Sequence, residues 1–126
     1  MDTRESIQRL YETGERDFSR VDLGRANLSG INLSGAFLIM ANLHEAKLTG
    51  AFLIGADLTG ANLGNANLHK ALLFGADLGG ANLNGANLSE ANLVGVNLED
   101  ALVTDEQLAQ AKSLQFTVMP DGTVHN

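Results

Sequence analysis

Three histidines are the side chains of this 126-residue chain best suited to catalysis or metal binding. His44 and His69 lie 25 residues apart, and His125 is next to the C-terminal residue. A zinc site needs three or four converging ligands, and no aspartate or glutamate is spaced to complete one here. The chain has no cysteine, which excludes disulfides, thiolate metal sites and cysteine nucleophiles. We therefore expect surface histidines and no metal or other cofactor.

Asp57 and Asp77 are the carboxylates whose spacing comes nearest to a catalytic pair. Acid–base chemistry also needs a pocket and a perturbed pKa, whereas both aspartates occupy a repeated, outward-facing position. The serines and threonines have no histidine and aspartate spaced to form a triad. Gly79 and Gly80 lack the strand–loop–helix context of a phosphate loop. The sequence predicts a protein that is not an enzyme.

A five-residue repeat runs through residues 21–100 and divides them into sixteen units. The third residue is Leu in all sixteen units, the first is Ala in thirteen, the second is Asn or Asp in twelve, and the fifth is Gly in nine. A period of five matches neither the helix nor the straight strand, so the chain must bend within every unit. Such bending winds a solenoid whose leucines share one interior. The predicted core includes Leu38, Leu43, Leu48, Leu53, Leu58, Leu63, Leu68, Leu73, Leu78 and Leu83.

Each position of the unit has a predicted role. The first and third residues lie two apart, so both point inward from a short extended segment. The second points outward, where Asn or Asp is short enough to hydrogen-bond the nearby backbone. The fourth and fifth residues form a corner, and Gly at the fifth position suits the positive φ of a type II-like turn.

The repeat resembles the consensus A-[D/N]-L-x-x of the pentapeptide-repeat proteins, over about residues 16–103. The resemblance implies an all-β solenoid, a right-handed quadrilateral β-helix with four units and twenty residues per coil. The sixteen units then make about four coils. We expect short α-helical caps at both ends, because a solenoid exposes its terminal coils. The predicted organisation is a capping helix at 1–15, the β-helix at 16–103, and a short helix and tail at 104–126.

The two caps have recognisable helix-start signals. Asp2 and Glu5 have capping-box spacing before an amphipathic run, and Thr104 and Gln107 have it before a short helix that is expected to reach about Lys112. The tail after that helix either adds a strand or lies against a face of the tower.

Departures from the repeat gather apolar residues on the outside of the tower. A step of twenty residues stacks Phe52 with Leu72, and Ile54 with Phe74 and Val94. Phe37 and Ile39 add to this patch from the adjoining face. Contiguous exposed apolar patches of this kind mark interfaces. Three alternatives stay open, namely cover by the termini or tolerated exposure, a homodimer face, and a face for a different protein.

Two functional hypotheses follow. The first is a rigid, non-catalytic scaffold or protein–protein interaction module of unassigned biochemical role. The second comes from the resemblance, since some longer family members mimic duplex DNA and bind and protect DNA gyrase. A DNA mimic needs dense negative charge on one face, and residues 21–100 carry seven carboxylates against three basic side chains, a net of 3 − 7 = −4.

Charge and hydropathy argue against two classes of partner, nucleic acids and membranes. The formal net charge of −7 argues against direct nucleic-acid binding. The N-terminal residues do not resemble a signal peptide and no apolar run is long enough to span a membrane, so we expect a cytoplasmic protein without membrane contact.

Overall fold

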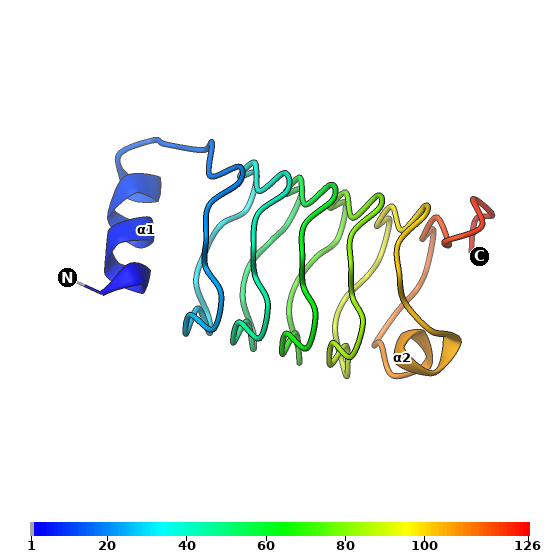
Figure 1. Cartoon of the computed structure of the whole chain (residues 1–126). Helices are drawn as coiled ribbons and strands as arrows, with labels where there is room; N and C mark the ends of the chain where they lie inside the picture. The colour runs from blue at the N-terminus through cyan, green and yellow to red at the C-terminus, as the bar shows by residue number, and fades with distance from the viewer. Residues whose placement is uncertain (1) are drawn as a thin grey trace.

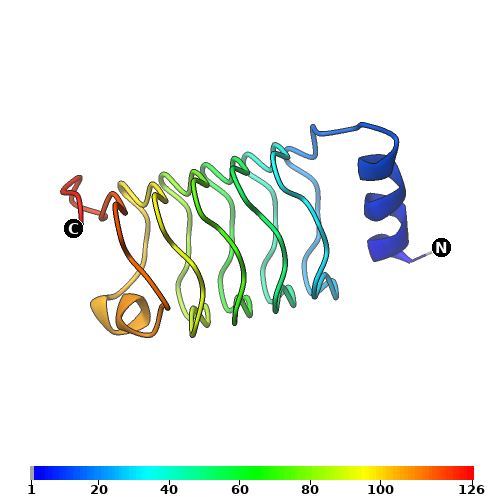
Figure 2. The same cartoon turned by 180° about the vertical axis from the view of Figure 1, so that it is seen from behind.

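The chain winds into a tower of stacked coils with a helix at each end (Figure 1). The structure, a computed structural model, describes residues 2–126. Helix α1, Thr3–Glu12, lies beyond the first coil, and helix α2, Asp105–Ala109, lies beside the last one (Figures 1 and 2).

Parallel bridges between residues twenty apart hold the coils together. Asp57, for example, pairs with Phe37 in the coil before it and with Asp77 in the coil after it. The bridges form four columns, which begin at residues 17, 22, 27 and 32. A turn follows every bridge, so each side of a coil holds one bridged residue, and residues 2–126 contain no longer strand. The strands expected for an all-β solenoid are therefore reduced to single bridges.

One unit repeats the same hydrogen bonds throughout the tower. The Leu58 N–H donates to the Asp77 carbonyl of the next coil at 2.7 Å, and the Ala61 N–H donates to the Leu58 carbonyl at 3.0 Å. The second bond closes the corner turn. The fifth residue has positive φ in all sixteen units, between 55° and 73°, although seven of these residues are not glycine. The coil therefore imposes this backbone conformation whatever side chain is present.

Gly30→Ala tests the cost of that conformation. Gly30 has φ of +70° and open space where a Cβ would lie, so only the backbone opposes the change. We expect the free energy of unfolding to fall by about 1 kcal/mol, since an L-residue pays roughly 1–2 kcal/mol in this region and the unfolded chain returns part of it. Chemical denaturation measures the change. Ser29→Ala, at the neighbouring residue of the same corner, should change stability by less than about 0.5 kcal/mol, and equal effects would contradict the argument.

The interior is a stack of leucines flanked by alanines. The ten leucines predicted for the core are each 0 to 1% exposed. The alanines at the first position are small enough to let the corners close around them, and those from Ala36 to Ala81 are also buried, at 0 to 1% exposed.

The N-terminal cap packs onto the first coil. The Asp2 side chain accepts a hydrogen bond from the Glu5 N–H and begins α1. Ile7 of this helix is buried against the leucine core. The Tyr11 hydroxyl donates to the Ser34 carbonyl at 2.7 Å, which ties the helix to the tower.

The C-terminal segment continues the tower after a short interruption. Helix α2 is shorter than predicted, because the Lys112 N–H donates to the Ala91 carbonyl at 2.9 Å and has returned to the coil ladder. Ser113 then bridges to Asn92, and Val118 bridges to Asn97. Of the two alternatives for the tail, the structure has the one that extends the sheet.

Candidate interaction face

The column that begins at residue 32 carries most of the predicted apolar patch. Bridges join Asn32 to Phe52, Phe52 to Leu72, and Leu72 to Asn92. Within each coil the second and fourth residues lie side by side, as the bond from the Val94 N–H to Asn92 Oδ1 at 3.0 Å demonstrates. We call the following outward-facing residues of this face the apolar strip: Phe52, Ile54, Leu72, Phe74 and Val94.

The apolar second-position residues do not make a hydrogen bond that the Asn and Asp units of the tower make. At ordinary units the second-position Asn or Asp accepts a bond from the N–H two residues later, as Asn67 does from His69 at 3.0 Å. Phe37, Phe52 and Leu72 have no side-chain acceptor and make no such bond. At Phe52 the hydroxyl of Ser34, one coil earlier, accepts the Ile54 N–H instead, at 3.2 Å. The apolar residues therefore replace groups that stabilise the corner.

The strip is open to solvent. Phe52 is 41% exposed and Phe74 is 38% exposed, while the other three residues of the strip are half-buried. Neither terminus covers them, because α1 and the tail lie at opposite ends of the tower (Figures 1 and 2). Cover by the termini is therefore wrong, whereas tolerated exposure, a homodimer face and a face for a different protein stay open.

Phe37 and Ile39 lie outside the strip, in the adjoining column, as expected from the sequence. Phe37 bridges to Asp17 and Asp57, so carboxylates lie before and after it. Phe37 is 48% exposed and Ile39 is half-buried. Met40 from the same unit lies over Gly60, where a Cβ would meet its sulfur.

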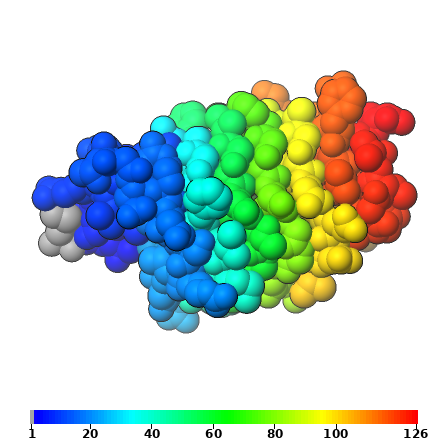
Figure 3. All heavy atoms as spheres, turned by 90° about the horizontal axis from the view of Figure 1, so that it is seen from above, coloured from blue at the N-terminus to red at the C-terminus, as the bar shows by residue number. Residues whose placement is uncertain are grey.

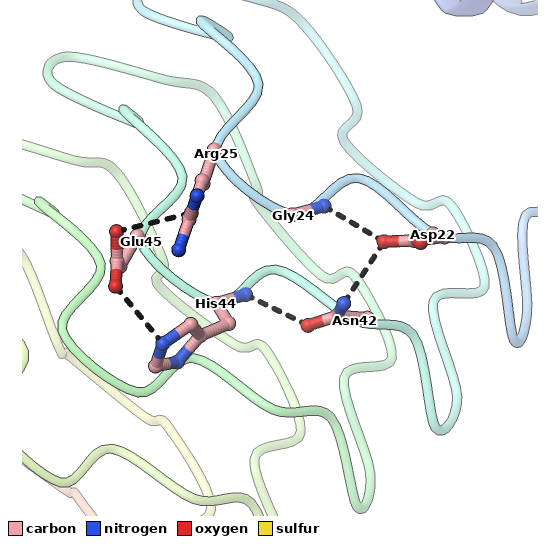
Figure 4. Close-up of polar contacts among 6 residues, drawn as sticks. All are labelled: Asp22, Gly24, Arg25, Asn42, His44 and Glu45. Atoms are coloured by element: carbon pink, nitrogen blue, oxygen red, sulfur yellow. Dashed lines mark hydrogen bonds and ion pairs between the residues drawn. The ribbon is translucent and has the colours of Figure 1, made fainter.

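A polar cluster joins the first coils on another column (Figure 4). Glu45 pairs with Arg25 at 3.3 Å and with the ring of His44 at 3.1 Å. The Asn42 amide donates to the Asp22 carboxylate at 2.9 Å. These pairs are largely exposed, and surface ion pairs contribute little stability. The cluster is best explained as a surface contact between coils.

His69 makes a contact that the spacing of the serines did not reveal. Its Nδ1 lies 2.6 Å from the Ser89 hydroxyl, one coil away. Both residues are at the fourth position and differ by twenty, which is the signal that could have identified the pair. No carboxylate hydrogen-bonds to His69 in the described part of the chain, so there is no triad. Over residues 2–126 no three potential metal ligands converge either.

Several open depressions lie on the surface of residues 2–126. One, of about 260 Å³, lies beside the strip and is lined by Lys70, Leu72, Glu90, Asn92 and Lys112. Figure 3 shows the coils as successive bands on one face of the molecule. Within residues 2–126, no helix has the length and apolar character needed to cross a bilayer.

Two exposed aspartates at corners have shifted pKa values. Hydrogen bonds from the backbone and side chain of Ser19 hold the pKa of Asp17 below its usual 3.8. Thr123 lowers the pKa of Asp121 in the same way. A lowered pKa in the folded state contributes stability above the ordinary pKa, and that contribution is lost as the pH falls through the folded-state value. Both aspartates accept backbone hydrogen bonds that stabilise their corners.

Comparison with known proteins identifies the repeat. A family profile described as pentapeptide repeats matches eight copies, over residues 17–51, 38–73 and 71–105. Among curated proteins, none matches this chain significantly.

Several solved structures are similar to this chain. A pentapeptide repeat protein from Nostoc Pcc 7120 is 38% identical with a TM-score of 0.77, over 85% of this chain and 92% of the other. One from the Arabidopsis thaliana thylakoid lumen is 30% identical with a TM-score of 0.67, over 79% and 69%. One from the cyanobacterium Cyanothece 51142 is 49% identical with a TM-score of 0.63, over 64% and 54%. The resemblance seen in the sequence is thereby confirmed, and the chain belongs to the pentapeptide repeat family.

Proposed function

We propose that this chain is a non-catalytic protein-binding module, a rigid right-handed quadrilateral β-helix whose apolar strip is the contact face. One observation carries the proposal. Phe52 and Leu72 replace the Asn or Asp that would hold the corner, yet they remain partly exposed. A side chain that makes no corner hydrogen bond and remains exposed to solvent adds little to the stability of the fold. We therefore assign it a role in binding.

The DNA-mimic hypothesis gains no support from the arrangement of charges. Asp57 and Asp77 stack in one column, but Phe37 precedes them and Asn97 follows them. Such a column is not the dense, continuous negative face that imitation of a duplex needs.

The double variant Phe52→Asn/Leu72→Asn tests the proposal without unfolding the tower. The asparagine at position 72 supplies an acceptor for the Phe74 N–H, worth about 0.5–1.5 kcal/mol, and the one at position 52 replaces Ser34 as acceptor of the Ile54 N–H. These bonds offset the lost apolar contacts. We expect the free energy of unfolding to stay within about 1 kcal/mol of the parent chain. Binding to proteins captured from a lysate of the source organism, or self-association, should fall at least tenfold.

Lys47→Asn is the matched control. Lys47 is also a second-position departure, but it lies in another column, between Asn27 and Asn67. This variant should supply the corner hydrogen bond at its own unit and leave binding to other proteins and self-association unchanged. If the strip variant keeps its partners and its mass in solution, the strip is not a contact face and the proposal is wrong.

A further inference from the structure

We infer that the apolar strip binds a second copy of this chain, with the two towers parallel and related by a two-fold axis that runs along them. The inference rests on the proposed function, because it names the partner of the same face. The order of the side chains, the edges of the face and the charges beside them favour this arrangement.

The order of large and small apolar residues matches itself across such an axis. A two-fold axis parallel to the tower sets each second position against the fourth position of the same coil in the other copy. Phe52 then meets Ile54, and Leu72 meets Phe74. In one coil the aromatic ring is at the second position and in the next it is at the fourth. Every ring therefore faces an aliphatic side chain, and the surfaces complement each other in size.

Glycines form one edge of the face over four coils, and Phe116, which has the same positive φ and is 59% exposed, continues this edge in the C-terminal coil. The corner after the strip is formed by Gly35, Gly55, Gly75 and Gly95, and the space beside the first three is open for 4 Å. Beside the Phe52 and Leu72 coils no side chain projects beyond the strip on this side, so a second face can approach closely there, whereas Phe116 projects at the C-terminal end.

The charges beside the strip favour the parallel arrangement. Lys70 forms the opposite edge of the Leu72 coil and has no ion pair within residues 2–126. In the parallel dimer it faces the Gly75 corner of the other copy, and Asp77 lies just beyond that corner. One oxygen of Asp77 accepts bonds from the Gly79 N–H at 2.9 Å and the Asn97 amide at 3.1 Å, which leaves its second oxygen available. Two Lys70–Asp77 pairs, one on each side, follow from the symmetry.

An antiparallel pair matches the charges less well. An axis across the towers, midway between the Phe52 and Leu72 coils, also brings apolar residues together. It places like edges against each other, however, so that the two copies of Lys70 are offset along the tower by only about one coil spacing, roughly 5 Å. Repulsion between these ammonium groups opposes that arrangement.

The size of the strip sets the strength of the contact. A fully exposed aromatic side chain presents about 150–250 Å², so Phe52 and Phe74 at 41% and 38% exposure offer roughly 60–100 Å² each. This is a small part of the roughly 800 Å² per partner that a stable complex buries. We therefore expect a weak dimer with Kd in the micromolar range or above.

Sedimentation of the full-length chain over a wide concentration range tests the inference. The parent chain and Lys47→Asn should dimerise with the same Kd, whereas Phe52→Asn/Leu72→Asn should dimerise at least tenfold more weakly. Lys70→Glu should also weaken the dimer, and Lys70→Glu combined with Asp77→Lys should recover part of the loss. A parent chain that stays monomeric up to millimolar concentration would overturn the second-copy inference. The proposed function would survive that result if the strip variant still lost a different protein partner.

Cysteine cross-linking decides the orientation, because the chain has no cysteine of its own. In the parallel dimer Asn92 of one copy faces Val94 of the other, whereas the antiparallel dimer pairs Asn92 with Asn32. A mixture of the Asn92→Cys and Val94→Cys variants should form disulfide-linked dimers faster than a mixture of Asn92→Cys and Asn32→Cys. The reverse order would exclude the parallel arrangement.

Discussion

Leu58→Ala should lower the free energy of unfolding by about 2–5 kcal/mol, the range for truncation of a fully buried leucine. Leu58 is 0% exposed and lies in the middle of the tower, in register with Leu38 and Leu78. Hydrogen bonds hold the surrounding coils together: the Leu58 N–H donates to the Asp77 carbonyl of the next coil at 2.7 Å, and the Asp57 N–H donates to the Ala36 carbonyl of the preceding coil at 2.9 Å. The side chains around Leu58 are therefore fixed in place. They cannot move in to fill the space, so we expect the upper half of the range.

Urea denaturation followed by circular dichroism measures this loss. Leu102→Ala is the control, because Leu102 also bridges to the preceding coil but is 60% exposed. Its truncation should cost less than about 1 kcal/mol. Equal losses at the two positions would mean that the leucine stack is not the main source of stability.

Gln107→Ala should lower the free energy of unfolding by about 2–4 kcal/mol, the sum of an orphaned carbonyl and a lost helix cap. The Gln107 Nε2 donates to the Leu83 carbonyl at 2.7 Å and to the Ala86 carbonyl at 2.9 Å. In a regular coil, the backbone N–H twenty-one residues later would serve the Ala86 carbonyl, as that of Asn87 serves Ala66. Here α2 occupies that side of the coil, and a side-chain amide takes the place of the missing backbone donor.

Two further variants separate the roles of this side chain. Gln107→Glu keeps the Oε1 acceptor that receives the Thr104 N–H at 2.8 Å but loses the donor to the ladder. It should therefore show most of the loss. Gln110→Ala, at an exposed position beside the helix end, should be nearly neutral. Limited proteolysis should cut Gln107→Ala near α2 first, and an unchanged pattern would contradict the capping role.

The ends of the chain were predicted with mixed success. Both helix starts were correct, because the capping residues Asp2 and Thr104 act within one turn. The end of α2 was placed too late, at about Lys112. The helix ends before Lys112 because the Lys112 N–H donates to the Ala91 carbonyl of the preceding coil. Local propensity contains no information about that contact.

The candidate face was predicted in part. The twenty-residue step taken from the family resemblance placed Phe52 and Leu72 in one column, and the bridges have that register. The same step predicts the column of Phe37, which flanks the strip and lies among carboxylates. The pairing of His69 with Ser89 was missed, because it depends on the rotamers of two side chains in different coils.

The sequence by itself determined the repeating unit of this protein, with Ala and Leu inward, a polar residue outward and a corner after them. All of these features depend on contacts within five residues or on the burial of a regularly spaced side chain, so they can be read along the chain. Only the tertiary structure decided that the tail extends the sheet and that neither end of the chain covers the strip. It also decided that Gln107 completes the ladder. Both results depend on contacts between segments that are far apart in the sequence. The packing of the whole tower determines which of these contacts form.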